Sequence, residues 1–159
     1  MPYDVRIEEA EARQTAVVTA RLPMAQVPEW MSGAFREVFA VLGRQGVGPA
    51  EPPFARYTMA PEAFEIEAGV PALRAIMAEG RVTPGSLPGG PVAVTTHLGP
   101  YDRLGDAVEA ATRWAQVRGI DITGPHWEVY HTDPSAEPDP ERWRTDVVVP
   151  LALEAERVG

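Results

Sequence analysis

Glu128 lies in a stretch whose residue types are suited to acid–base chemistry or to binding a cation. The stretch covers residues 124–134 and reads GPHWEVYHTDP. Its Gly-Pro and Asp-Pro ends are typical of turns, so the sequence predicts a short strand between them. Because successive side chains of a strand face opposite sides, Glu128 and Tyr130 share one face, and Trp127 and Val129 share the other.

Glu128 has a structural and a functional interpretation. A carboxylate among apolar and aromatic side chains carries a desolvation penalty unless a cation or hydrogen-bond donors meet it. In the structural interpretation, backbone groups or an arginine of a neighbouring strand bind the carboxylate. In the functional interpretation, Glu128 transfers a proton as general acid or base, or pairs with a cationic ligand. Tyr130 would then orient water or stack against the ligand; otherwise it is an ordinary core residue.

The same stretch holds two histidines, which are common metal ligands. Strand parity places His126 and His131 on opposite faces, so the sequence predicts no metal site. The chain contains no cysteine, which excludes a thiolate nucleophile, a disulfide and a cysteine-based metal site. No residue can be assigned as a haem ligand, and we predict no cofactor.

The rest of the sequence supplies the strands and helices that would hold this stretch in place. Runs of β-branched and apolar residues predict strands at residues 5–8, 14–22, 54–59, 64–68, 91–98 and 143–151. Pro28 suits the first turn of a helix and Gly46 its end, while Asp102 is the predicted N-cap of a second helix that ends at Gly119. Apolar side chains recur at three- and four-residue steps in both helices, at Met31, Ala34, Phe35, Val38, Val41 and Leu42 and at Leu104, Ala107, Val108, Ala111, Trp114 and Ala115.

Three connections between these elements have their own signals. Ala60-Pro61 predicts a hairpin turn between the strands on either side of it. Residues 73–79 fit either a short helical turn or an irregular crossover. Residues 80–90 contain two prolines and four glycines, and we predict a linker there.

The order of elements repeats once along the chain. Leu22 corresponds to Leu98, Gly46 to Gly119 and Tyr57 to Tyr130, at nearly constant separations. The sequence therefore predicts an α+β fold of two tandem strand-helix-strand-strand modules, about residues 1–79 and 91–151, which form one curved antiparallel sheet with a helix from each module. Neither half has enough apolar surface for its own core, so we expect a single domain over residues 1–159 with a central groove.

The composition limits the classes of function. The chain has 159 residues, of which 45% are hydrophobic, and this is enough to bury a core. The formal net charge of −9 argues against direct binding to nucleic acid, because phosphate contacts need clustered basic residues. It mildly favours a cationic or neutral small ligand. The sequence has no secretion signal or membrane-spanning run, so we expect a cytoplasmic protein without a membrane partner.

Several motifs that follow one another along the chain are similar to those of a known bacterial family. They are PPFARYTM, FEIEAGVP, LPGGPVAV, HLGPYDRL, GPHWEVYHTDP and WRTDVVVPL. Together they resemble the GyrI-like small-molecule-binding domain, which occurs alone and as the effector-binding domain of AraC-type and MerR-type transcription regulators. The resemblance covers residues 5–151. It implies a hydrophobic pocket that holds a glutamate of the second module, which is Glu128 in this sequence.

The resemblance implies three functions. The first is a stand-alone effector-binding or multidrug-binding domain for bulky aromatic or cationic small molecules; no helix-turn-helix precedes it, so DNA binding would reside on another chain. The second is a hydrolase that opens the cyclopropane ring of DNA-alkylating natural products, with Glu128 as acid or base and Tyr130 assisting, and whether the protein is an enzyme stays open. The third is a gyrase-inhibitor-like module that binds a protein partner. The ligand-binding residues would be Trp30, Met31, Phe35, Tyr57, Met59, Tyr101, Glu128 and Tyr130.

Overall fold

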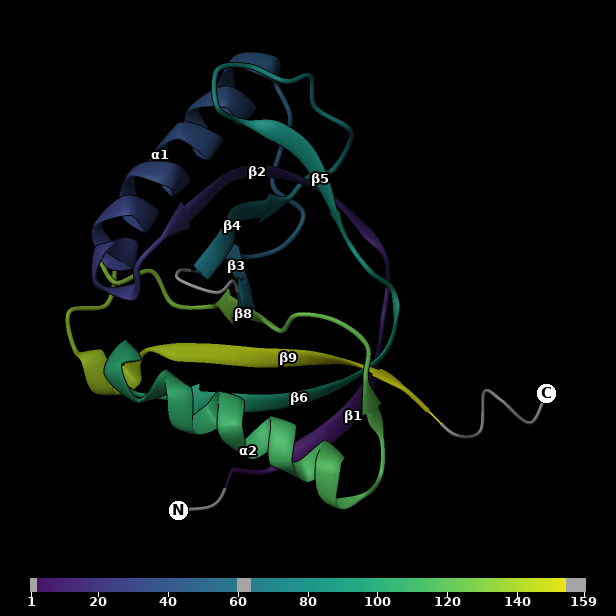
Figure 1. Cartoon of the computed structure of the whole chain (residues 1–159). Coiled ribbons are helices and arrows are strands. Elements are labelled where there is room, and N and C mark those ends of the chain that lie inside the picture. Colours follow the sequence, from purple (N-terminus) through teal and green to yellow (C-terminus); the bar gives the residue numbers. More distant parts are fainter. Residues whose placement is uncertain (1–2, 60–63, 154–159) are drawn as a thin grey trace. The chain divides into compact units, whose positions relative to one another are not determined.

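The computed structural model describes residues 3–59 and 64–153, and the chain divides into two compact units (Figure 1). Unit 1 comprises Met1–Glu11 and Gly89–Gly159, and unit 2 comprises Ala12–Pro88. Within the described residues, each unit contains antiparallel strands and one long α-helix. The α+β class predicted from the sequence is therefore confirmed, as is the strand-helix-strand-strand order of both modules.

The sheet of unit 2 has the strand order β3-β4-β2-β5. Its members are β2 (Arg13–Leu22), β3 (Phe54–Met59), β4 (Phe64–Pro71) and β5 (Thr83–Leu87). β4 lies between β3 and β2, antiparallel to both, and β2 pairs with β5 along its first half. The predicted pairing of β3 with β4 is confirmed, whereas the Ala60-Pro61 turn lies outside the described residues.

Helix α1 (Val27–Gln45) covers one face of β2 and β4 (Figure 1). It follows the short 3-10 helix η1 (Met24–Gln26), and Pro28 lies in its first turn, as predicted. Gly46 ends the helix with a φ of 67°, which glycine adopts without strain. The stripe that faces the sheet consists of Val27, Ala34, Val38, Val41 and Leu42, which are buried.

The sheet of unit 1 has the strand order β1-β6-β9-β8, and a short strand β7 also pairs with β9. Its members are β1 (Val5–Ala10), β6 (Gly90–Leu98), β7 (Asp121–Ile122), β8 (Trp127–Tyr130) and β9 (Arg144–Ala152). β1 precedes β2 in the sequence but pairs with β6, from Val5↔Thr95 to Ala10↔Gly90. The last strand was predicted one residue too early at each end.

Helix α2 (Leu104–Val117) packs on β6 and β9 through buried Leu104, Ala107, Ala111 and Ala115. Asp102 is not its N-cap, contrary to the prediction. The residue lies in a 3-10 helix, η2 (Tyr101–Arg103), and no side chain caps α2. The Leu104 N–H instead donates to the Tyr101 carbonyl, so this turn satisfies a terminal amide that a side-chain cap would otherwise bind.

The linker predicted over residues 80–90 is wrong, because β5 lies within it. Pro84 lacks a backbone N–H, and a proline is tolerated in an edge strand such as β5. Gly85 permits close approach, since a Cβ there would lie 2.8 Å from Thr15 Oγ1 and 3.1 Å from Glu67 Oε2. Pro84 and Gly85, two of the residues that indicated a flexible connection, are thus compatible with a paired edge strand, and Gly85 is needed for its close approach to β2.

Residues 73–79 and the loop between β8 and β9 contain little regular structure. Residues 73–79 form an irregular crossover rather than a helical turn, and Ile76 anchors them in the core of unit 2. The loop between β8 and β9 contains a 3-10 helix, η3 (Pro140–Arg142), whose cap Asp139 accepts a hydrogen bond from the Glu141 N–H.

No helix in the described part of the chain is long and apolar enough to span a membrane.

Candidate functional site

Glu128 is almost enclosed, with an exposed fraction of 6%. The Tyr130 hydroxyl donates a hydrogen bond of 2.8 Å to its Oε1 atom, which confirms that the two side chains share a face. His126 Nε2 lies 3.6 Å from Oε2, a separation longer than a normal hydrogen bond. Over the residues that the structure describes, no arginine lies within 4 Å of this carboxylate. The arginine partner of the structural interpretation is therefore not found there, and a neutral phenol takes its place.

Two further aromatic rings extend from Tyr130. Its ring centroid lies 5.7 Å from that of Tyr101, which in turn lies 5.0 Å from Trp143 at a tilt of 37°. These separations are in the range of favourable aromatic pairs. The Trp143 indole N–H donates to the Glu137 carbonyl at 2.8 Å, which fixes the outer ring of the group. We call Tyr101, Tyr130 and Trp143 the aromatic cluster.

The Tyr101 side chain is held in its neutral, protonated form, in which the hydroxyl can donate a hydrogen bond. Burial of the phenol, followed by the negative charges of Asp133 and Glu128, raises the pKa of Tyr101 above its ordinary value of about 10. Its side chain nevertheless remains partly exposed, at 37%. Unit 1 thus combines an enclosed carboxylate with neutral rings, one of which reaches solvent.

The opposite face of β8 and β9 carries a separate polar group centred on Asp146. Thr96 Oγ1 donates to its carboxylate at 2.8 Å, His131 Nε2 lies 3.0 Å from Oδ2, and Arg144 Nη2 lies 3.3 Å from the same oxygen. His131 and His126 therefore face opposite sides, as strand parity predicts. Among the described residues, no three His, Asp or Glu side chains are grouped so that they could hold a metal ion.

Asp146 makes the stability of the protein sensitive to acid. Burial is the largest influence and would raise its pKa, but the Thr96 hydroxyl and the charges of His131 and Arg144 together hold the pKa of Asp146 below the ordinary value. A carboxyl whose pKa is lower in the folded state stabilises the fold above its unfolded pKa of about 3.9, and this contribution is lost as the pH falls through the folded pKa.

We therefore expect Asp146→Asn to lower the melting temperature at pH 7 and at pH 5. The difference between wild type and variant should shrink as the pH falls below about 4, because the carboxyl then takes up a proton, first in the unfolded and at lower pH in the folded protein. Thermal denaturation monitored by circular dichroism over this pH range measures the difference. Asp121→Asn, at an exposed position of β7, is the control. A deficit of Asp146→Asn that stays constant down to pH 2 would contradict the assignment.

The sequence-predicted site residues of unit 2 lie in and around its own core. Trp30, Met31 and Phe35 pack on the apolar cluster between α1 and the sheet. The Trp30 indole N–H is buried and has no hydrogen-bond partner among the described residues. Tyr57 is half-buried in β3 opposite Ile66, and Met59 is the last residue of that strand. Contact of these residues with a ligand stays a prediction.

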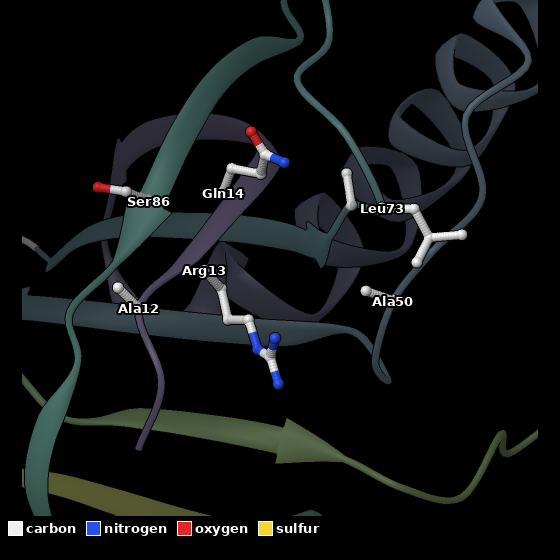
Figure 2. Close-up of a pocket in the computed structure, with 7 residues that line it drawn as sticks. Ala12, Arg13, Gln14, Ala50, Leu73 and Ser86 are labelled. Atoms are coloured by element: carbon white, nitrogen blue, oxygen red, sulfur yellow. The ribbon is translucent and has the colours of Figure 1, made fainter.

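Unit 2 also has an open groove of about 490 Å³, which none of the predicted site residues lines. Figure 2 shows Arg13, Gln14 and Ser86 around it, together with apolar side chains that include Leu73. The Arg13 guanidinium donates to Glu51 Oε2 at 2.9 Å, so an acidic side chain already binds the basic group of the groove. We assign no function to the groove.

Two residues beside Glu128 and Tyr101 were not predicted. His126 precedes Glu128 by two positions, so the strand parity that paired Glu128 with Tyr130 also indicated it. Trp143 gave no such signal, because it reaches Tyr101 only through the antiparallel pairing of β6 with β9.

Residues 3–152 match the GyrI-like small molecule binding domain, and the chain belongs to this family. The resemblance inferred from the motifs is confirmed. No curated protein is a significant match to the sequence.

Solved structures with the same fold include the C-terminal domain of EcmrR, with 17% identity and a TM-score of 0.84 over 96% of this chain and 99% of that one. In the EcmrR–DNA complex, the match has the same identity and a TM-score of 0.83 over 94% of this chain, which spans only 57% of the EcmrR chain. A hydrolase from Listeria innocua matches with 15% identity and a TM-score of 0.69, covering 96% of this chain and 94% of that one. SAV2435 bound to tetraphenylphosphonium matches with 9% identity and a TM-score of 0.63, covering 97% and 96%. At these identities, the neighbours establish the fold alone.

Proposed function

We propose that this protein binds bulky aromatic cations, with Glu128 as the counter-charge and the aromatic cluster as the contact surface. Membership of a small-molecule-binding family supports the general class of ligand. The tetraphenylphosphonium bound to SAV2435 supports the particular chemistry, since that ion combines four phenyl rings with one positive charge.

The observation that carries the proposal is the environment of the Glu128 carboxylate. It is 6% exposed, and the hydrogen bond it accepts in the described structure comes from a neutral hydroxyl. A buried carboxylate without a full counter-charge is unfavourable, so a cation that approaches it relieves part of the desolvation penalty. Neutral or anionic molecules of the same shape give no such relief. Charge complementarity therefore predicts which ligands are selected.

The rings beside the carboxylate supply the second half of the recognition. Aromatic groups pair favourably with phenol and indole rings, and a cation over a ring face is attracted to it. Tyr101 is the member of the cluster that combines a stacked ring with exposure to solvent. A ligand with aromatic arms around a central charge can use both features at once.

The test compares two ions of nearly identical shape and opposite charge, tetraphenylphosphonium and tetraphenylborate. We expect isothermal calorimetry to detect binding of the phosphonium and at least tenfold weaker binding of the borate. Equal affinity for the two ions would mean that hydrophobic contact alone drives binding, and it would remove Glu128 from the proposal.

A second candidate function is hydrolysis of a strained electrophile, and the hydrogen bond between Tyr130 and Glu128 favours it. A carboxyl paired with a phenol at 2.8 Å is arranged for proton transfer to or from a reacting group. The similarity to a hydrolase from Listeria innocua is consistent with this chemistry.

Tyr130→Phe separates the two functions, because it removes one hydroxyl and keeps the ring. For a binding protein, we expect the affinity for tetraphenylphosphonium to change by less than about threefold, since the counter-charge and the stacking surface remain. For a hydrolase, turnover of a cyclopropane-containing alkylating compound should fall by about a hundredfold or more. Mass spectrometry of the ligand after incubation measures turnover. If wild type leaves the compound intact, the second candidate is excluded.

A further inference from the structure

Strand β1 presents one edge to solvent. Among the described residues, β6 is the only strand with which β1 pairs, and it lies along one side of β1 (Figure 1). The four central residues, Arg6, Ile7, Glu8 and Glu9, are exposed, and Ile7 has an exposed fraction of 45%. Such an edge leaves backbone N–H and C=O groups free to pair with another strand.

The residue order of β1 is complementary to itself in the antiparallel register centred on Ile7, and not in the two registers next to it. When two copies of a strand pair antiparallel about a two-fold axis, side chains that lie opposite each other point to the same face of the sheet. One residue therefore lies opposite its own copy, and the axis passes midway between the two. An axis at Arg6 would place two guanidinium groups opposite each other, and an axis at Glu8 would place two carboxylates opposite each other. An axis at Ile7 places Arg6 of each copy opposite Glu8 of the other copy, and the two isoleucines meet at the centre.

We propose that β1 is a dimerisation edge, at which a second copy of this chain adds antiparallel to β1 with the two-fold axis at Ile7. Charge complementarity favours a second copy of the strand in this register, since the two neighbouring registers each place like charges opposite one another. Cross-strand pairs of opposite charge and of apolar side chains stabilise an antiparallel pairing, whereas like charges destabilise it. The exposed apolar side chain of Ile7 is then covered by its own copy.

The contacts within one chain are compatible with this pairing. Arg6 Nε already lies 2.5 Å from Glu8 Oε2 of the same strand, and Arg6 Nη2 lies 3.9 Å from Asp146. Both Arg6 and Glu8 are about half exposed, at 44% and 49% for their side chains, so they can turn toward a second copy. A single pair of short strands buries little surface and the net charge of −9 opposes association, so the dimer is weak and depends on concentration.

The first test exchanges the charges and measures the dimer by sedimentation equilibrium at about 150 mM salt, where distant surface charges are screened. We expect Arg6→Glu to raise the dimer dissociation constant by about tenfold or more, because both symmetric pairs become repulsive. The double variant Arg6→Glu with Glu8→Arg should restore dimerisation, since the pairs are re-formed with their signs reversed. Arg142→Glu, at an exposed position of η3, changes the net charge equally and should leave the dimer unchanged.

The second test uses the absence of cysteine from the chain and needs no change of charge in β1. In the proposed register, the two copies of residue 7 have Cα atoms about 4.5–5.5 Å apart, which permits a disulfide. Two copies of residue 9 lie about 13 Å apart along the strands and cannot be bridged. We therefore expect Ile7→Cys to form a covalent dimer under mild oxidation much faster than Glu9→Cys.

Equal rates for the two cysteine variants would overturn the register. A wild-type protein that stays monomeric, together with slow cross-linking of Ile7→Cys, would overturn the dimer. If Arg6→Glu misfolds by circular dichroism, the comparison of the cysteine variants still decides the question.

Discussion

Replacing Glu128 with glutamine should weaken the binding of tetraphenylphosphonium by about tenfold to a hundredfold, because the ligand loses its counter-charge in an enclosed setting. Glutamine has nearly the same shape and can still accept the Tyr130 hydrogen bond through its amide oxygen. The change therefore removes the charge and leaves the aromatic contacts. Isothermal calorimetry on both proteins measures the loss.

Two controls make this result specific. Glu109→Gln changes the net charge by the same amount at an exposed position of α2, and its affinity should equal that of wild type. Tetraphenylborate should bind Glu128→Gln at least as well as it binds wild type, since a repulsive charge has been removed. If the variant binds the phosphonium with unchanged affinity, Glu128 is a structural residue and the proposed site is wrong.

Replacing Gly69 with alanine should destabilise unit 2 severely. A Cβ at this position of β4 would lie 1.9 Å from the Ala16 carbonyl oxygen and 2.8 Å from Val17 Cα, both in the backbone of β2. Backbone atoms of a paired central strand cannot move aside as a flexible side chain can, so the register between β2 and β4 must distort. We expect a loss of at least about 3 kcal/mol, or a fall in melting temperature of about 10 °C, if the variant folds at all.

Gly33→Ala is the matched control, because the same methyl group is added in a different setting. Gly33 lies in the middle of α1, and an added Cβ would have no atom within 4 Å. Alanine favours the helix over glycine, so this variant should be more stable than wild type by about 0.5–1 kcal/mol. Thermal and urea denaturation measure both variants. Equal stability of Gly69→Ala and wild type would mean that β2 and β4 do not approach as closely as the structure has them.

Much of each unit could be predicted from local sequence patterns. The three- and four-residue steps from Ala34 to Leu42 marked the face of α1 that packs on its sheet, because helical periodicity needs no information from distant residues. Gly46 marked the end of that helix because few other residues tolerate a positive φ. Strand parity likewise placed Glu128 and Tyr130 on one face, where a hydrogen bond now joins them.

Local sequence patterns did not predict strand pairings or side-chain contacts whose partners are distant in the sequence. Pro84 and Gly85 look the same in a flexible linker and in an edge strand, and only pairing with β2 makes their segment β5. Trp143 completes the aromatic cluster, and Thr96 and His131 contact Asp146, through the pairing of β9 with its neighbours. Strand order is set by which apolar faces and backbone edges fit together in the folded chain.

The sequence by itself determined the family, the α+β class, the two long helices and the pairing of a carboxylate with a phenol on one strand face. The helices and the shared strand face depend on residue type and on spacings of two to four positions, and the family on short motifs that follow one another along the chain. Only the tertiary structure decided that β1 joins β6, that no described arginine neutralises Glu128, and that Gly69 has no room for a methyl group. The reason is physical: these features depend on the register between strands that are distant in sequence, and local propensity carries no information about that register.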